Sequence, residues 1–276
     1  MVNFAHSHKL LSNAIFLRPM RLRHFCLVCL SLLCLMAVAG DHNDTIRVMS
    51  LNLHAGHDAS LTQIGLLIKQ YQPDFVALQE VDQFTHRANS RHQNNRDFIT
   101  ELAYFSGMQG LFGPTIEFCG GHYGIGLLTR HQFVDVRNIK LPHPVPSMEQ
   151  RGLLEGRFIL PDGDTIMVAC THFEAFDAVS RQAQGQFVEE HYAHVPYPVI
   201  LAGDFNASPT DAVIQRLTGQ WLDCTGDAPT FSVKQPSEKI DYILARPKQC
   251  WQAVESQVIP VAVSDHFPVI ATLVRR

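Results

Sequence analysis

Four short polar segments carry side chains that can bind a metal ion or move a proton, and each adjoins or interrupts an apolar run. They hold Asn52 in Met49–Leu53, Glu80 in Leu78–Asp82, Asp204 and Asn206 in Leu201–Asn206, and Asp265 and His266 in Ser264–Pro268. Carboxylate and amide oxygens are hard ligands, which suit Mg²⁺, Mn²⁺ or Ca²⁺ better than zinc. Histidines beside them can transfer protons and contact phosphate. The segments therefore predict a metal-dependent enzyme.

The apolar runs beside these residues indicate how the fold positions them. Ile46–Met49 precedes Asn52, and Val199–Ala202 precedes Asp204. Short apolar runs next to turn residues are typical of buried strands. Polar groups at the ends of such strands meet at one rim of a sheet, where a site can form.

Strand and helix signals alternate along the chain around a central block of strands. Strands are predicted over Ile46–Leu53, Asp74–Val81, Met108–Ile116, His122–Arg130, Phe133–Leu141, Gly152–Leu160, Asp164–Phe173, Pro198–Phe205, Lys239–Arg246, Ala253–Ile259 and Phe267–Val274. Helices are predicted over Leu61–Tyr71, with Ser60 as N-cap, and over Asn94–Phe105, Ser180–His194 and Thr210–Leu217. So many strands need more than one sheet. We therefore expect one α/β domain of two packed β-sheets flanked by helices, because a single parallel sheet fits the central block poorly.

The N-terminal residues have a composition of their own. Arginines precede an apolar run of 15 residues, Phe25–Ala39, which ends in Ala37-Val-Ala. This pattern predicts a signal peptide over residues 1–39, cleaved after Ala39, and a catalytic domain over residues 40–276. An uncleaved membrane anchor is the alternative, although the run is short for a span of roughly 20 residues. We expect export to the periplasm or the extracellular space.

Net charge bears on the class of substrate. Residues 1–39 contain four of the 22 basic residues and none of the 26 acidic ones, so their removal changes the formal charge from −4 to −8. An acidic balance disfavours a protein that binds polyanions without specificity. It argues modestly against a broad-specificity nuclease.

Cysteine usage gives two expectations. Cys170 lies in an apolar run and is predicted to be a buried free thiol. Cys224 and Cys250 flank the predicted strand that contains Asp241. Export would permit a disulfide between them, and the sequence leaves this pairing open.

Seven short motifs occur in order over residues 46–273. They are Ser-Leu-Asn52-Leu, Leu-Gln-Glu80-Val, Tyr123-Gly-Ile-Gly-Leu-Leu, Thr-His172-Phe, Gly-Asp204-Phe-Asn206, Ile-Asp241-Tyr-Ile and Ser-Asp265-His266-Phe-Pro. Together they resemble the endonuclease/exonuclease/phosphatase superfamily, which includes deoxyribonuclease I, exonuclease III, inositol polyphosphate phosphatases and bacterial sphingomyelinases. The resemblance implies a four-layer α/β sandwich like that of deoxyribonuclease I, with mainly antiparallel sheets and metal-dependent phosphoester hydrolysis.

The resemblance also implies a metal site. Glu80 matches the metal-binding glutamate of the superfamily, and Asn52 assists the same metal or the phosphate. Asp265 matches a carboxylate on the metal side. The implied cofactor is Mg²⁺, with Mn²⁺ as the alternative.

The same motifs imply the catalytic groups. Asp204 helps to activate water or to hold the metal, and the amide of Asn206 contacts the phosphate. His266 lies at the scissile phosphate, Asp241 orients it, and His172 donates to a phosphate oxygen. The chemistry is consistent with these roles, because an attacking water loses a proton while the phosphoryl oxygens gain charge. Asp241 within an apolar strand would also be costly to bury without a partner.

Two arginines are candidates for binding the substrate phosphate. Thr85-His-Arg87 and Gln150-Arg151-Gly resemble a secreted or membrane-associated bacterial branch of metal-dependent hydrolases. Members of that branch commonly have serine at position 88 and proline at position 150, where this chain has Ala88 and Gln150. A planar guanidinium can bind phosphate through two hydrogen bonds. A structural salt bridge is the alternative for each arginine.

Neighbouring polar residues are given no catalytic role. Asp82, Glu174 and Asp177 are expected to be solvated or to make local hydrogen bonds, and His54 and His57 are expected at the rim of the site.

These observations favour an exported, Mg²⁺-dependent phosphoesterase, specifically a phosphodiesterase, that acts as a monomer. Water would attack in line without a covalent intermediate. The first alternative is a nuclease acting on DNA or RNA. The second is a sphingomyelinase-like or phosphoinositide-directed enzyme, which would need an exposed apolar loop such as Phe112–Tyr123 to contact membrane lipid. A catalytically inactive binding module is disfavoured, because all seven motifs are present.

Overall fold

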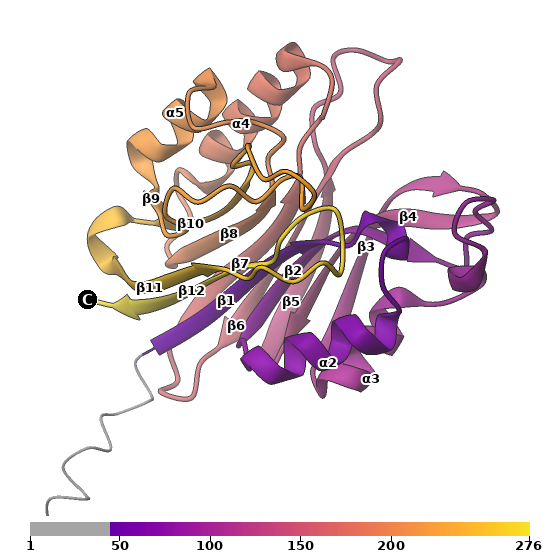
Figure 1. Ribbon diagram of the computed structural model, residues 1–276. Coiled ribbons are helices and arrows are strands. Elements are labelled where there is room, and N and C mark those ends of the chain that lie inside the picture. Colours follow the sequence, from indigo (N-terminus) through magenta and orange to yellow (C-terminus); the bar gives the residue numbers. More distant parts are fainter. Residues whose placement is uncertain (1–44) are drawn as a thin grey trace, which may run out of the picture. The chain divides into compact units, whose positions relative to one another are not determined.

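The computed structural model describes residues 45–276. The predicted signal peptide, residues 1–39, and the cleavage expected after Ala39 lie outside the described residues. Within residues 45–276 the chain forms two six-stranded sheets that pack against each other, with helices on both outer faces (Figure 1). The expected α/β arrangement of two mainly antiparallel sheets flanked by helices is confirmed.

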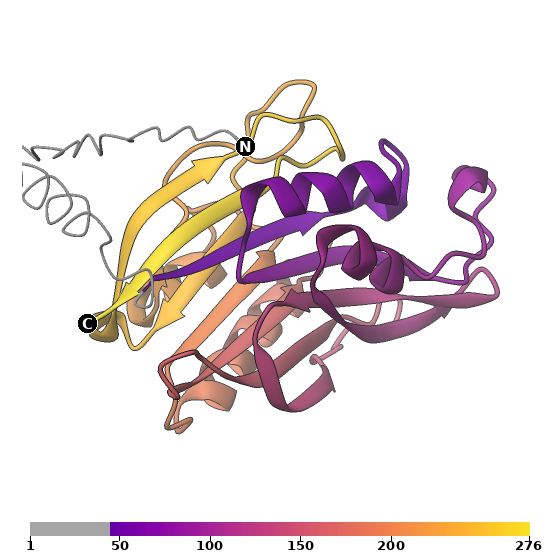
Figure 2. The same ribbon diagram turned by 90° about the horizontal axis from the view of Figure 1, so that it is seen from below.

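The first sheet joins both ends of the described chain. Its strand order is β11-β12-β1-β2-β4-β3. The strands are β1 (Thr45–Asn52), β2 (Phe75–Gln83), β3 (Gln109–Phe118), β4 (Gly121–Thr129), β11 (Trp251–Val258) and β12 (Val269–Arg275). β1 and β2 are parallel, and the other neighbours are antiparallel. The C-terminal strand β12 therefore lies beside β1 (Figure 2).

The second sheet comes from the middle of the sequence, in the order β5-β6-β7-β8-β10-β9. Its strands are β5 (Gln132–Lys140), β6 (Gly152–Ile159), β7 (Thr165–His172), β8 (Val199–Asp204), β9 (Leu222–Asp223) and β10 (Asp241–Arg246). Only β7 and β8 are parallel neighbours. The two-residue β9 is the one strand of either sheet that the sequence patterns did not predict.

Successive side chains of a strand point to opposite faces of its sheet, so the apolar side chains form three layers. One layer lies between the two sheets, and the other two lie between each sheet and its helices. Val48 and Ala77 of the first sheet face Val168 and Ile200 of the second in the layer between the sheets. The outer face of the first sheet packs against α2 (Leu61–Tyr71) and α3 (Phe98–Ser106), and that of the second packs against α4 (Ala178–Tyr192) and α5 (Ala212–Gln220). The result is helices, sheet, sheet and helices in four layers (Figure 1).

Local capping residues set the helix ends. Ser60 caps the start of α2 and the helix ends before Pro73, as the sequence predicts. The structure adds a capping box between Ser60 and Gln63 and a left-handed Gln72 at the end of the helix. The predicted helix over residues 94–105 begins later, because Asp97 caps α3 by accepting from the backbone N–H of Thr100.

The cysteines of the described part are all free thiols. Cys170 is buried between the sheets, as predicted from its apolar run. Cys224 is buried and Cys250 half-buried, and the disulfide left open by the sequence is not formed.

The segment considered as a membrane-contacting loop, residues 112–123, is instead strand and hairpin. It covers most of β3, the turn after it and the start of β4. The ring of Phe118 lies under the guanidinium of Arg87, 4.5 Å from centroid to Cζ. No helix among residues 45–276 is long and apolar enough to cross a membrane.

Candidate active site

Strand ends bring the predicted catalytic side chains together. His172 ends β7, Asp204 ends β8 and Asp241 begins β10. In the register of the second sheet, Asp204 is paired with His172 on one side and with Asp241 on the other. Asn52 ends β1 in the first sheet, and its amide NH₂ donates to Asp204 Oδ2 at 3.1 Å. The site therefore spans the rims of both sheets.

Asp204 is the centre of this arrangement. Its Oδ2 lies 3.5 Å from His172 Nε2 and 3.7 Å from His266 Nε2. Its Oδ1 accepts from the backbone N–H of Asn206 at 2.8 Å, which turns the chain at this strand end. Burial and the nearby Asp241 carboxylate raise the pKa of Asp204 to about 7, although His266 opposes the shift.

His266 and Asp241 form a buried pair. His266 Nδ1 lies 2.9 Å from Asp241 Oδ2, and the ring of Phe231 packs against the imidazole with centroids 4.8 Å apart. Burial by itself would lower the pKa of His266, but the charges of Asp241, Asp204 and Asp265 outweigh it and raise this pKa to about 10. The second oxygen of Asp241 is buried without a hydrogen-bond partner among residues 45–276.

His172 has the opposite environment. Its Nδ1 lies 3.1 Å from a guanidinium nitrogen of Arg151. Burial, followed by the positive charges of Arg151 and His266, holds the pKa of His172 well below its usual range. Asp204 therefore lies between one histidine favoured in its charged form and one favoured in its neutral form.

Glu80 reaches the site from an irregularity in β2. The pairing of β2 with β4 shifts register between Leu78 and Val81, and Glu80 within this bulge has φ of +55°. A left-handed backbone is unfavourable for a residue with a Cβ and recurs at functional sites, where bulges re-aim side chains. Glu80 Oε1 accepts from the amide NH₂ of Asn52 at 3.2 Å. Asn52 thus links the carboxylates of Glu80 and Asp204.

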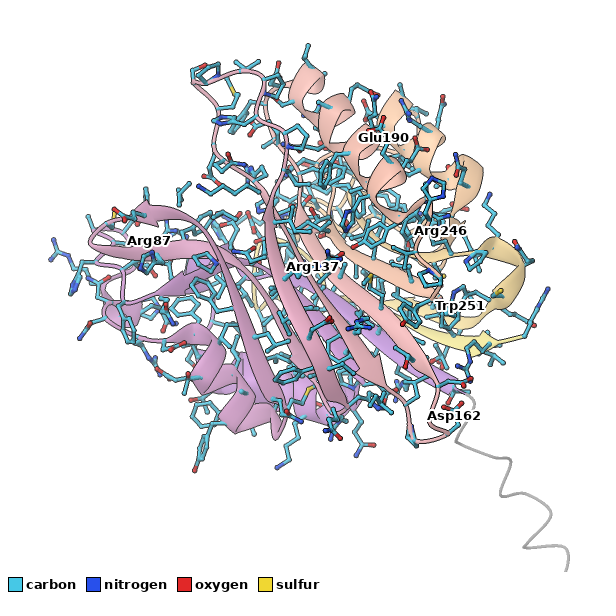
Figure 3. All side chains as sticks on the ribbon, turned by 180° about the vertical axis from the view of Figure 1, so that it is seen from behind. Arg87, Arg137, Asp162, Glu190, Arg246 and Trp251 are labelled. Atoms are coloured by element: carbon cyan, nitrogen blue, oxygen red, sulfur yellow. The ribbon has the colours of Figure 1, made fainter. Side chains whose placement is uncertain are left out.

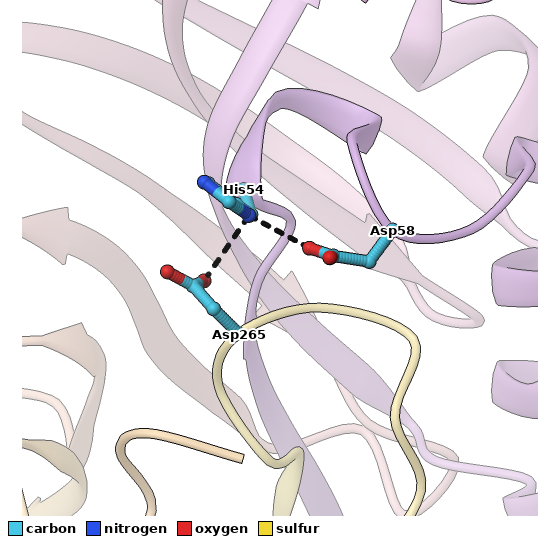
Figure 4. Close-up of side chains that lie close together, drawn as sticks. All are labelled: His54, Asp58 and Asp265. Carbon is cyan, nitrogen blue, oxygen red and sulfur yellow. Dashed lines mark hydrogen bonds and ion pairs between the residues drawn. The ribbon is translucent and has the colours of Figure 1, made fainter. Parts of the chain in front are cut away.

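Asp265 lies in a second, more exposed group. His54 Nδ1 is 2.7 Å from Asp58 Oδ2 and 3.7 Å from Asp265 Oδ1 (Figure 4). A cavity of about 430 Å³ borders this group, and its walls include Phe231 and Lys234. Because Phe231 also contacts His266, the cavity adjoins the catalytic pair. His54 lies at the rim of the site, as expected.

The residues present fit a hard divalent cation. Glu80 and Asp265 offer partly exposed carboxylates, and Asp204 and Asp241 are buried acids packed side by side. The unpartnered oxygen of Asp241 marks an excess of acceptors over donors. Within residues 45–276, Asp204, Asp241 and His266 form one group of metal-ligand type, and His54, Asp58 and Asp265 form another. These groups offer carboxylate oxygens and imidazole nitrogens but no thiols, which is consistent with Mg²⁺ or Mn²⁺.

The remaining predicted substrate groups already have partners within the protein. Arg87, which is labelled in Figure 3, pairs with both oxygens of Asp82, at 2.5 and 2.9 Å. This is the structural salt bridge considered as the alternative. Asn206 donates its amide NH₂ to the carbonyl of Phe173 at 3.0 Å. Asp82 is buried rather than solvated, because Arg87 and Thr85 donate to it.

Sequence patterns missed two acidic residues near His172. Glu149 Oε1 lies 3.1 Å from the same Arg151 nitrogen that reaches His172, and Glu174 Oε2 lies 3.5 Å from Arg151 Nε. Glu174 is buried and makes the expected local hydrogen bond, because its Oε1 accepts from the backbone N–H of Phe176 at 3.0 Å, but it also contacts Arg151. The sequence signal that could have revealed these two acids is their spacing. Glu149 lies two residues before Arg151, and Glu174 lies two residues after His172.

Comparisons with known proteins agree with the fold and the motifs. A model of the "Endonuclease/Exonuclease/phosphatase family" matches residues 49–266. Nocturnin of Homo sapiens is 27% identical over 187 residues, which cover 62% of this chain and 41% of that protein. The chain thus spans less than half the length of this curated relative.

Solved structures share the fold at low identity. An endonuclease/exonuclease/phosphatase from Beutenbergia cavernae has a TM-score of 0.72 at 23% identity, over 84% of this chain and 72% of that one. The human Nocturnin catalytic domain with bound sulfate has a TM-score of 0.65 at 22% identity, over 84% and 94%. A mannosyl-6-phosphatase from Bacteroides thetaiotaomicron has a TM-score of 0.64 at 19% identity, over 83% and 99%.

Proposed function

The chain belongs to the endonuclease/exonuclease/phosphatase family of metal-dependent phosphoester hydrolases, and on that premise we propose that it is an exported, Mg²⁺-dependent phosphodiesterase. The observation that carries this proposal is the position of Asp204. It lies between two buried histidines, with Asn52 joining it to Glu80. This arrangement supplies an acceptor, donors and metal ligands at one rim.

The proposed metal ligands are Glu80, with Asn52 beside it, and Asp265 from the group that also holds His54 and Asp58. A divalent cation bound there would neutralise charge on the phosphoryl oxygens. Asn52 donates to both Glu80 and Asp204, so it holds these two carboxylates in a fixed relation. Loss of Asn52 would leave two acids close together without their common donor.

The proton transfers are assigned to groups of the chain itself. Asp204 accepts a proton from the attacking water as the new P–O bond forms. His266, held by Asp241, gives a proton to the leaving oxygen as the old P–O bond breaks, and His172 donates to a non-bridging oxygen. Deep burial of all three side chains excludes bulk water and strengthens these interactions.

The net charge favours a substrate that is a small phosphodiester, or a diester without further charged groups, over a polynucleotide. Without residues 1–39 the formal charge is −8, since four of the 22 basic and none of the 26 acidic residues are removed. Long-range attraction of a polyanion is then weak.

The test is a substrate panel on purified protein with Mg²⁺, Mn²⁺ or Ca²⁺. It compares bis-p-nitrophenyl phosphate, p-nitrophenyl phosphate, plasmid DNA, RNA, sphingomyelin and phosphoinositides. We expect Mg²⁺-dependent turnover of the diester above the monoester. Preference for the monoester would overturn diester specificity, and turnover mainly of nucleic acid or lipid would select one of the alternatives.

A further inference from the structure

The guanidinium of Arg151 is committed to contacts inside the protein. Arg151 is 6% exposed, and it lies between three partners. One terminal nitrogen is 3.1 Å from His172 Nδ1 and 3.1 Å from Glu149 Oε1. Its Nε lies 3.5 Å from Glu174 Oε2. These contacts differ from the substrate-phosphate role expected from the sequence.

The contact with His172 determines where the imidazole proton lies. A guanidinium carries only donors, so His172 Nδ1 must accept the hydrogen bond from Arg151. The proton of a neutral imidazole is then on Nε2, the nitrogen that lies 3.5 Å from Asp204 Oδ2. A doubly protonated ring could not accept this bond.

We propose that Arg151 is a positioning residue that fixes the tautomer and orientation of His172, and that Glu149 and Glu174 hold the guanidinium in place. The comparison with His266 shows what this achieves, because His266 Nδ1 faces a carboxylate at 2.9 Å where His172 Nδ1 faces a guanidinium. The two histidines that face Asp204 Oδ2 therefore differ at Nδ1, which donates to a carboxylate in His266 and accepts from a guanidinium in His172. The catalytic consequence rests on the proposed function, whereas the tautomer does not.

The surrounding chain keeps Arg151 in register with His172. Arg151 immediately precedes β6, which pairs with β7 through Leu153 and Thr171. The loop after β7 is tied to α4, because Gln184 accepts from the backbone N–H of Glu174 at 2.9 Å. A second hydrogen bond, from the backbone N–H of Phe176 to Glu174 Oε1 at 3.0 Å, holds the carboxylate of Glu174 near Arg151 Nε.

The direct test is nitrogen NMR of the histidine side chains in ¹⁵N-labelled protein, with His172→Gln to assign the resonances. We expect His172 to be protonated on Nε2 and unprotonated on Nδ1 in the wild type. In Arg151→Met the Nε2–H population should fall, and Arg151→Lys, which keeps a donor, should restore part of it. Arg216→Met is the matched control, because Arg216 forms an ion pair with Glu189 instead.

Two NMR outcomes would overturn the proposal. One is a wild-type His172 protonated on Nδ1, and the other is an unchanged His172 spectrum in Arg151→Met. Loss of Arg151 leaves two acids without their partner, so the variant could fail to fold. Arg151→Met combined with Glu174→Gln removes one of the unpaired charges and keeps the measurement interpretable.

Kinetics separates positioning from substrate binding. On the best substrate of the panel, Arg151→Met should lower kcat by at least about tenfold with little change in KM. In the double variant with His172→Gln, Arg151→Met should cause no further loss of kcat. A rise in KM, with losses that multiply in the double variant, would instead make Arg151 a phosphate-binding residue. Absence of activity on every phosphoester would overturn the proposed function and leave the NMR result to decide the tautomer.

Discussion

Asp241 lies directly opposite Asp204 on the antiparallel strands β10 and β8, and His266 contacts both acids. The imidazole has Nδ1 at 2.9 Å from Asp241 Oδ2 and Nε2 at 3.7 Å from Asp204 Oδ2. Two buried carboxylates side by side repel each other, and a cationic ring between them offsets that repulsion. The three side chains should therefore behave as one unit.

The first prediction concerns the pair formed by Asp241 and His266. His266→Ala should lower kcat by roughly three orders of magnitude, the scale of losing a key proton donor or oxyanion donor. Asp241→Asn keeps the shape but removes the charge that orients the imidazole, so it should also be severe. A double-mutant cycle on kcat should show the double variant to be little worse than His266→Ala. Simple additivity would show that Asp241 acts separately.

The second prediction is metal dependence. EDTA should abolish hydrolysis and Mg²⁺ or Mn²⁺ should restore it, because the predicted ligands are oxygens. Glu80→Gln should fold normally but lose most activity. As a readout independent of activity, Mg²⁺ should raise the melting temperature of the wild type more than that of Glu80→Gln. Full activity in chelator, or in Glu80→Gln, would exclude the assigned metal role.

The third prediction concerns stability and pH, and it uses a buried acid away from the catalytic pair. Glu155 accepts from Tyr192 Oη at 2.7 Å and His191 Nε2 at 2.9 Å, and Arg137 forms an ion pair with it. Burial opposes its ionisation, but these partners outweigh burial and lower the pKa of Glu155 below the ordinary value of 4.5. Its ionised form therefore stabilises the folded chain above that value, and the contribution is lost as pH falls through the lower folded pKa.

Chemical denaturation across this pH range tests the effect of Glu155. Glu155→Gln should reduce the free energy of unfolding at neutral pH by about 1–3 kcal/mol, as expected for lost hydrogen bonds to a charged group. Its stability should also fall less steeply on acidification than that of the wild type. Identical pH slopes for the two proteins would show that Glu155 does not contribute in this way.

The fourth prediction concerns export. The mature protein should begin near Gly40, because the apolar run Phe25–Ala39 ends in a small-residue cleavage pattern. Intact-mass measurement of protein recovered outside the cytoplasm checks this. Recovery in the membrane fraction with Phe25–Ala39 retained would favour the anchor instead.

Local sequence signals were sufficient for most of the helices and strands, although the short β9 and the start of α3 were not predicted. Ser60 and Pro73 bound α2 through local effects, so both ends of the helix could be predicted to the residue. Polar residues that end apolar strands, such as Asn52 and Asp204, indicated one rim because the ends of neighbouring strands meet there.

Tertiary structure alone decided how those side chains are partnered. The pairing of Asp204 with Asp241 depends on the register of β8 with β10, and the backbone of Glu80 depends on a bulge against β4. The contact of Arg151 with His172 joins residues 21 positions apart. Residue type and spacing set which groups can donate or accept, but strand register and burial determine which of them meet. Those depend on the packing of the whole chain, which no local pattern records.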